Sequence, residues 1–510
     1  MTVLSTQTSS LHFPFDHSFA RELPGLYLPW QPQPAPAPRW LRFNHELARE
    51  LGLDADRLAS DEGLAVFSGQ VVPPGAQPIA LAYAGHQFGG FSPQLGDGRA
   101  LLLGEVLDPL GRRHDIGFKG SGPTPFSRGG DGKAAVGPVL REYLISEAMH
   151  ALGIPTTRTL AAVATGETVR RERLLPGAIL TRTAASHLRV GTFQFLAARG
   201  DVSGLRRLLR YTIARHDPAL MDTPEPALAL LRAVMERQAA LVARWMGVGF
   251  IHGVMNTDNM TLSGETIDYG PCAFMEAHDP DTVFSSIDDH GRYAYANQPG
   301  IAQWNLARLA EALLPVMNLP EAQAVERATA LVNEYPAIYR ACWLTECRRK
   351  LGLVDTADAS GDQALANDYL QLLHRWQVDH TLGFRLLSTV LRTGSSGATP
   401  ALAEHFGAGT PALEAWLERW RCRLAQQPGR ADEAADRMDA ANPLVIPRNH
   451  LVEAALDAAS TDANLRPFEA LLTAIRQPFD ATRTGTRTGT IWTQPGSPEQ
   501  TRGYRTFCGT

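Results

Sequence analysis

The sequence predicts an α+β protein in which a strand-rich small lobe is followed by a mostly helical large lobe. Between residues 100 and 190, several stretches read as strands; before Lys119, for example, Ile116 and Phe118 alternate with smaller residues. From Thr192 onward, apolar residues recur at helical spacing, for example over residues 226–250. This helical pattern leads directly into a polar loop around Asp258, and the loop is the most informative stretch of the chain.

Composition is that of an ordinary globular protein. The chain has 510 residues, of which 44% are hydrophobic and 20% charged, enough for two or three domains. Its net charge of −5 gives no indication of a nucleic-acid partner. We find no basic-then-apolar signal segment and no apolar run long enough to cross a bilayer. We therefore expect a cytoplasmic protein that binds neither nucleic acid nor membrane, with a monomer favoured and the oligomeric state left open.

The pattern divides the chain into four segments. We expect an N-terminal helical extension at 1–80, the small lobe at 81–190, the large lobe at 191–350, and a C-terminal helical extension and tail at 351–510. The Pro-rich stretch 28–40 is typical of an extended strap or linker. The apolar pattern over residues 43–61 indicates a helix.

The small lobe opens with a glycine turn. An apolar run from Ala100 to Leu103 reads as a strand, and it is preceded by Gly96, Asp97 and Gly98. Arg99 lies directly before the strand. Glycines allow backbone N–H groups to approach phosphates closely, although the same triplet is also a common hairpin signal. Both interpretations remain open at this point.

Lysine is rare in this chain: of the 48 lysines and arginines, only three are lysines. Lys119 ends a predicted strand, and a glycine-rich loop at 120–137, containing Lys133, follows. A helix then begins near Pro138 and stops at Gly153. Two helix residues, Glu142 and Glu147, are candidate partners for Lys119. We choose Glu142 because it comes earlier on the helix; the alternative is that either residue is a solvated surface group.

Residues 155–190 read as two or three strands that carry two arginines. Arg182 follows an apolar run and Arg189 comes seven residues later, a spacing that allows both guanidinium groups to reach one anion. Arginine is common throughout this chain, so the pair is equally compatible with ordinary surface positions.

The loop at 250–270 carries the candidate chemistry. Residues 260–262 and 266–268 read as two short strands of a hairpin, which would place Asp268 beside Asp258 and Asn259. Oxygen donors from Asn259 and Asp268 suit Mg²⁺, with Mn²⁺ as the alternative, and this leaves Asp258 as a base. The alternative is a simple surface turn, since Asp, Asn and Gly are frequent turn residues.

The order of these groups resembles the catalytic and metal-binding loops of protein kinases. One difference stands out. Where kinases have His-Arg-Asp, this chain has His252-Gly253-Val254, and valine cannot accept a proton. The nearest carboxylate is that of Asp258.

Long motifs extend the resemblance to one family. The stretches AYAGHQFGGFSPQLGDGRA, DIGFKGSGPTPFSRGGDGKA, ILTRTAASHLRVGTF, HGVMNTDNM and IDYGPCAFM are similar to those of the selenoprotein O family. That resemblance implies a protein-kinase-like two-lobe fold that binds ATP in a reversed orientation. It also implies protein adenylyltransferase activity, in which AMP is attached to Ser, Thr or Tyr hydroxyls of protein substrates and pyrophosphate is released.

The resemblance also assigns residues. It implies that ATP is contacted by Gly96, Gly98, Arg99, Lys119, Asp131, Gly132, Arg182, Arg189 and Asp268. It implies Asp258 as the catalytic base, supported by Lys119 and Glu142, and Asn259 and Asp268 as metal ligands. Two rival functions remain: a conventional phosphotransferase, and a catalytically silent ATP-binding pseudokinase module.

The five cysteines show no zinc-binding or disulfide pattern. Relatives often carry selenocysteine near the C-terminus, where this chain has Cys508. Cys508 and Cys272 are therefore candidates for redox control, with a plain buried thiol as the alternative for Cys272.

Overall fold

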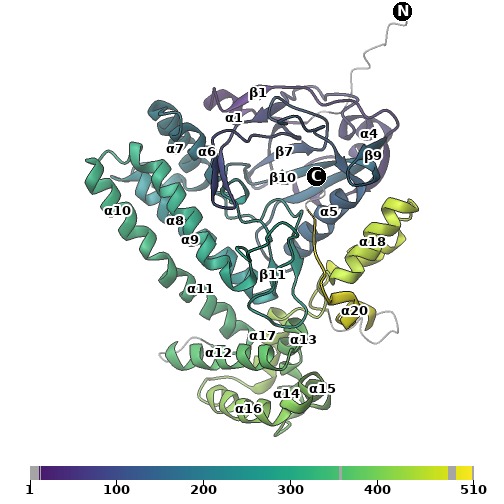
Figure 1. The fold of residues 1–510 in the computed structure, drawn as a ribbon, viewed down its shortest axis with the longest axis vertical. Coiled ribbons are helices and arrows are strands. Elements are labelled where there is room, and N and C mark those ends of the chain that lie inside the picture. Colours follow the sequence, from purple (N-terminus) through teal and green to yellow (C-terminus); the bar gives the residue numbers. More distant parts are fainter. Residues whose placement is uncertain (1–10, 12, 355–358, 481–489, 508–510) are drawn as a thin grey trace, which may run out of the picture.

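The computed structural model describes residues 11, 13–354, 359–480 and 490–507. It is a mixed α+β structure with a large antiparallel sheet and many helices, as the sequence predicts. In Figure 1 the sheet occupies the upper right, the long helices α8 to α11 lie to its left, and α12 to α17 lie below.

The main sheet has eight strands in the order β1-β3-β6-β7-β10-β9-β2, with β8 pairing β10. Two further two-stranded sheets are formed by β4 with β5 and by β11 with β12. The strands are β1 (Tyr27–Pro29), β2 (Arg39–Phe43), β3 (Ile79–Leu81), β4 (Gly85–Gln87), β5 (Gly90–Ser92), β6 (Ala100–Leu107), β7 (Arg113–Lys119), β8 (Ala134–Ala135), β9 (Arg158–Arg170), β10 (Leu174–Ala184), β11 (Phe250–Ile251) and β12 (Ala273–Phe274).

The first 80 residues are more strand-rich than expected. They contribute β1, β2 and most of β3 to the main sheet, in addition to α1 (Ser18–Glu22) and three short helices. The helix expected over 43–61 is divided into α2 (His45–Glu50) and α3 (Ala55–Leu58), and α4 (Asp61–Phe67) follows. Gly52 separates the first two with a left-handed backbone (φ +73°), which a continuing helix cannot adopt.

The sheet is covered on both faces. On one face, α5 (Val136–Ala151) packs against strand residues such as Leu180, in the largest apolar core of the protein. On the other face, α2 to α4 enclose a separate core that contains Phe118 and Ile179. Consecutive residues of β10 thus point to opposite cores, which explains the continuous apolar run in its sequence.

The C-terminal half is helical, as expected. Breaks predicted near 394–400 and 427–430 fall between α14 and α15 and between α16 and α17. The Thr-Arg-Gly repeat before Ile491 lies outside the described residues. The helices are α6 (Val190–Ala197), α7 (Val202–His216), α8 (Pro226–Val248), α9 (Gln298–Leu313), α10 (Glu321–Asn333), α11 (Tyr335–Lys350), α12 (Ala359–Arg375), α13 (His380–Arg385), α14 (Leu387–Thr393), α15 (Pro400–Phe406), α16 (Thr410–Leu424), α17 (Ala431–Ala441), α18 (Asn449–Thr461), α19 (Arg466–Ile475) and α20 (Pro498–Thr501).

The hairpin predicted at 260–268 is wrong. Thr261 forms an isolated antiparallel bridge with Arg189, and Thr266 forms a parallel bridge with Thr156. The two extended pieces therefore pair with segments distant in sequence rather than with each other, because those segments offer backbone groups on either side of the loop. The preceding residues Thr257–Asn259 form a short 3₁₀ turn that holds Asp258 and Asn259.

Across the described ranges, we find no helix with both the length and the apolar composition needed to cross a membrane.

Candidate active site

A cavity of about 1080 Å³ lies between the sheet, α5 and the loop that contains Asp258. All twelve residues assigned from the sequence line it: Gly96, Gly98, Arg99, Lys119, Asp131, Gly132, Glu142, Arg182, Arg189, Asp258, Asn259 and Asp268. Its wall includes eleven lysines and arginines but only seven aspartates and glutamates. The cavity is therefore cationic within a chain of net charge −5, and it suits an anionic ligand.

Strand register brings the first two cations together. Lys119 on β7 lies opposite Leu180 of β10, and Arg182 lies opposite Gly117. Residues directly opposite each other share one face of a sheet, as do residues two apart along a strand. Lys119 and Arg182 are thus diagonal neighbours on the face that looks toward α5.

Glu142 and Asp268 neutralise these cations. Lys119 Nζ lies 2.6 Å from Glu142 Oε2 and 2.6 Å from Asp268 Oδ1. Arg182 Nη1 donates to Asp268 Oδ1 at 2.8 Å and to Glu142 Oε1 at 3.2 Å. The Lys119–Glu142 pair chosen from the sequence is therefore present. Glu147 pairs instead with Arg158, at 2.8 Å, on the far side of the helix from Lys119.

Asp268 is the centre of this network. The surrounding cations Lys119, Arg182 and Arg189 hold the pKa of its carboxyl well below the usual range, despite burial. Its backbone is left-handed (φ +62°), a conformation that aspartate adopts more readily than most residues. Oδ2 lies 3.8 Å from Arg189, farther than Oδ1 lies from its two partners. Within the protein, Oδ2 therefore has weaker contacts with cations than Oδ1 has.

Asp258 lies in a different environment. Its side chain is buried, and burial raises the pKa of its carboxyl to about 6. Arg189 donates to the backbone carbonyl of Asp258 at 2.9 Å rather than to the carboxylate. Gln87 Nε2 approaches Oδ2 at 3.4 Å, and Oδ1 finds no hydrogen-bond partner among the described residues. A carboxylate with a raised pKa and few donors is suited to accept a proton.

Asn259 and Asp268 have the donor chemistry for a hard cation. Asn259 uses its amide nitrogen to donate to the carbonyl of Val254 at 3.0 Å, which orients the side chain and leaves its oxygen as a ligand. An amide oxygen and a carboxylate oxygen fit Mg²⁺, which usually takes few protein ligands and completes its shell with phosphate and water. Within the described ranges, no cluster of three or more His, Cys, Asp or Glu suited to a metal occurs.

The glycine turn is tightly constrained. Gly96 has a left-handed backbone (φ +79°), and a Cβ atom there would lie 2.4 Å from the ring of Phe126. Gly132 is similar (φ +66°), since a Cβ would lie 2.1 Å from the carbonyl oxygen of Gly122. Both positions therefore require glycine.

The loop at 120–137 covers one side of the cavity, as the sequence indicated. It is tied to the β9–β10 hairpin by Asp131, which pairs with Arg171 at 2.8 Å, and by Lys133, which pairs with Glu167 at 2.5 Å. Asp131 is thus held at the rim of the cavity by an ion pair within the protein.

Several lining residues escaped the sequence-based assignment. Arg128 and Arg171 lie in loops, and the sequence does not reveal where those loops run in the fold. Tyr83 lies under the guanidinium of Arg189, 4.4 Å from its ring centroid. The stretch 504–507 also lines the cavity, although it lies more than 200 residues from Asp268 in sequence. Thr506 is held there by its hydroxyl, which donates to the carbonyl of Pro271 at 2.7 Å.

Cys272 is fully buried, and burial raises the pKa of its thiol to about 12. A thiol with so high a pKa is unreactive at neutral pH, which favours the interpretation as a packing residue. Cys508 lies outside the described residues.

Comparison with known proteins agrees with this site. The sequence model of the family described as "Protein adenylyltransferase SelO" matches residues 11–476. The chain is 59% identical to the "Protein nucleotidyltransferase YdiU" of Cereibacter sphaeroides, over 98% of this chain and 100% of that protein. It is 56% identical to the protein of the same name from Methylorubrum populi, over 98% and 99% of the two chains. With that of Rhizobium etli the identity is 54% over the full length of both.

These matches confirm the family resemblance seen in the motifs, and the relatives' names agree with the expected nucleotidyltransferase activity. A match over most of the chain, together with relatives more than half identical over their whole length, establishes membership: the chain belongs to the SelO family of protein adenylyltransferases.

Proposed function

We propose that the protein transfers AMP from ATP to hydroxyl groups of Ser, Thr or Tyr side chains in other proteins. The observation that carries this proposal is the cavity in which Lys119, Arg182, Arg189 and Asp268 form one network beside Asp258. In this proposal the sheet with α5 forms the small lobe of a kinase-like fold, the helices from α6 onward form the large lobe, and the cavity between them holds ATP.

The reaction follows from where charge develops. The acceptor oxygen attacks the α-phosphorus, the bond from that phosphorus to the bridging oxygen breaks, and pyrophosphate leaves. Negative charge grows on the departing oxygens, where buried cations stabilise it most effectively. Lys119, Arg182 and Arg189 supply this stabilisation, while Gly96 and Gly98 leave room for the polyphosphate and Arg99 adds a cation at the mouth.

The acceptor proton passes to Asp258. A positioned base of this kind is typically worth ~10²–10⁴-fold in rate. Glu142 keeps Lys119 directed into the cavity, because its carboxylate holds the ammonium at 2.6 Å. Asp131 and Gly132 shape the cover over the nucleotide.

Asn259 and Asp268 would hold Mg²⁺ through their side-chain oxygens. The cation, when bound, adds positive charge at the phosphates. Binding this cation would also give Asp268 a role beyond pairing with Lys119 and Arg182.

Mass spectrometry tests the proposal directly. The purified protein is incubated with ATP and Mg²⁺, alone and with a cell extract, and intact masses and peptides are measured. An AMP-sized addition that disappears in Asp268→Ala is the expected result. A phosphate-sized addition would establish a conventional phosphotransferase, and ATP binding without any addition would establish a silent binding module.

A further inference from the structure

A second pocket, of about 540 Å³, adjoins the catalytic cavity. Phe88 and Ile287 line both, so the two spaces share a wall. The volume lies within the ~300–1,000 Å³ typical of ligand sites. We call the second space the hairpin pocket, because Phe88, which belongs to the turn between β4 and β5, lines it together with Ile287, Asp289, Arg292 and Ile301.

The environment of Asp258 limits the direction from which an acceptor can arrive. One carboxylate oxygen, Oδ1, lies against Gly85, where even a Cβ atom would come within 2.8 Å. The other, Oδ2, faces Gln87 at 3.4 Å, next to Phe88 in the chain. Arg182 and Arg189 also contact Asp268, where the proposed polyphosphate would lie. The remaining approach to Oδ2 passes the neutral side chains of Gln87 and Phe88, beside the hairpin pocket.

Phe88 is held in a costly conformation. Its backbone is left-handed (φ +50°), which strains a bulky residue, yet the residue is 38% exposed. The backbone N–H of Phe88 donates to Asn256 Oδ1 at 3.0 Å, and Tyr293 donates to the same oxygen at 2.7 Å. The ring of Phe88 also packs edge-on against Tyr293. Such strain persists where the surroundings fix a residue, and it is common at ligand clamps.

Apolar side chains of Phe88, Ile287 and Ile301 line the hairpin pocket beside polar or charged residues, which are Asp288, Asp289, His290, Arg292 and Asn297. Ile287 is 53% exposed. The carboxylate of Asp288 accepts from the backbone N–H groups of Arg292 and Tyr293, at 2.9 and 2.8 Å. Arg292 stacks over Trp304, with its Cζ 4.9 Å from the ring centroid. Exposed apolar and aromatic side chains with a stacked arginine are the composition typical of protein-binding surfaces.

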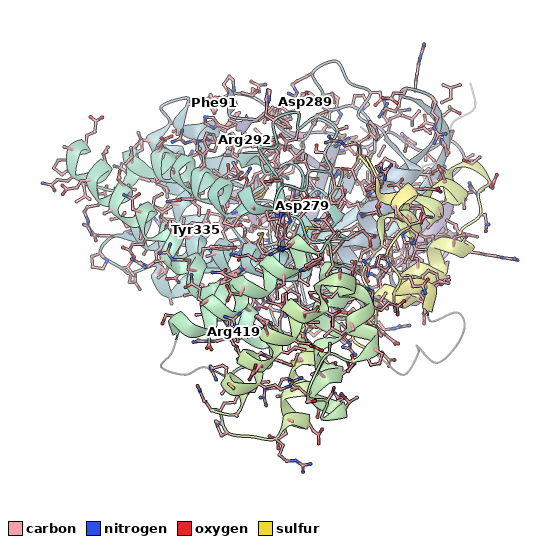
Figure 2. The ribbon with its side chains drawn as sticks, turned by 60° about the horizontal axis from the view of Figure 1, so that its bottom comes forward. Phe91, Asp279, Asp289, Arg292, Tyr335 and Arg419 are labelled. Carbon is pink, nitrogen blue, oxygen red and sulfur yellow. The ribbon has the colours of Figure 1, made fainter. Side chains whose placement is uncertain are left out.

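The surface continues beyond the pocket. Phe91 of β5 is 44% exposed and packs on His86, which in turn contacts Trp304. Figure 2 shows the labelled residues Phe91, Asp289 and Arg292 near one another at the top of that view. The apolar surface therefore leads away from the catalytic base along the hairpin.

We propose that the hairpin pocket binds an apolar side chain of the acceptor protein, close in sequence to the hydroxyl that receives AMP. This inference rests on the proposed adenylyl transfer. The pocket then selects acceptor sites by the residue beside the hydroxyl, while the nucleotide is bound independently on the cationic side of the cavity.

The first test maps the modified sites. Wild-type protein, ATP, Mg²⁺ and a cell extract are incubated, and peptides carrying AMP are sequenced by mass spectrometry. An aliphatic or aromatic residue should be enriched at one fixed position from the modified hydroxyl. Enrichment of a basic residue there, or no enrichment, overturns the pocket assignment while leaving adenylyl transfer intact. A wild-type protein that attaches no AMP overturns the proposed function itself, and the pocket assignment with it.

The second test uses a peptide copied from the strongest modified site. Ile287→Ser should raise the KM for this peptide about tenfold, with kcat and the KM for ATP within twofold of wild type. Replacing the peptide's apolar residue by alanine should give the same loss, with little further loss in Ile287→Ser. Leu110→Ser is the matched control, because Leu110 is a 77% exposed leucine in the β6–β7 turn. An unchanged peptide KM in Ile287→Ser refutes the assignment, as does a raised one in Asp289→Asn, which would indicate recognition of a basic side chain.

Discussion

Adding one methyl group at Gly85 should displace the proposed catalytic base, Asp258, without touching the proposed nucleotide site. A Cβ atom at this position would lie 2.8 Å from Asp258 Oδ1, 3.2 Å from Asp258 Cβ and 3.0 Å from Leu95 Cδ1. Ordinary contacts between carbon and oxygen are about 3.3–3.6 Å, so Oδ1 must recede by roughly 0.5–0.8 Å. Gly85 has no left-handed backbone, so Gly85→Ala introduces a steric change alone.

The expected loss of rate follows from this shift. Catalytic groups must stay within about 0.5 Å of the productive geometry, and a displacement of 1 Å can cost ~10²-fold. Gly85→Ala should therefore lower the single-turnover rate of AMP transfer about 10- to 100-fold, while the Kd for ATP stays within twofold. Overpacking should cost ~1–3 kcal/mol, which the Tm will register.

Gly90→Ala is the matched control in the same hairpin. Its Cβ would meet only the carbonyl oxygen of Gln87, at an ordinary 3.5 Å, and its backbone is not left-handed either. It should keep the wild-type rate. A folded Gly85→Ala protein with the wild-type rate would refute Asp258 as a precisely positioned base, and so would equal losses in the two variants.

Three further predictions concern charged groups. Asp268→Ala should abolish Mg²⁺-dependent turnover more completely than Asp258→Ala, because it removes both a metal ligand and the counter-ion of the buried cations; a rate assay giving the reverse ranking contradicts these roles. Glu142→Gln should weaken ATP binding about tenfold in calorimetry, whereas Glu147→Gln, at a buried structural ion pair, should lower stability by ~3 kcal/mol and leave ATP binding unchanged. Burial lowers the pKa of Lys350 to about 7, so between pH 7 and its ordinary pKa of 10.5 the unfolded chain binds the extra proton and wild-type stability rises with pH. Lys350→Met should thus raise the Tm most at pH 6, and the gain should shrink toward pH 10; a gain independent of pH would show that the folded protein does not depress this pKa.

The sequence by itself determined the chemical groups and the order of the elements. Lys119 at a strand end, the helix from about Pro138 to Gly153, and the Asp258–Asn259 pair are local patterns, because strand alternation, helix stops and turn residues depend on neighbours in the chain. The long motifs also identified the family. These features survive in the structure with shifts of only a few residues.

Local sequence patterns did not predict which distant segments pair with each other. The expected hairpin at 260–268 does not form, since its two extended pieces bridge to Arg189 and Thr156 instead. Likewise, β1 and β2 join the main sheet, although the Pro-rich stretch that they flank was expected to be only an extended strap or linker. Hydrogen bonding between strands depends on which backbone groups the folded chain places side by side, and a local pattern does not contain that information.

The environment of each carboxylate was decided by the tertiary structure alone. Asp258 and Asp268 are ten residues apart and chemically identical, yet burial raises the pKa of the first to about 6 and three cations hold the pKa of the second low. Those cations come from β7, β10 and the residue preceding α6. The sequence supplied two aspartates; the environments that support their proposed roles as base and phosphate-side ligand depend on long-range packing, because solvation and charge are set by whatever the fold places nearby.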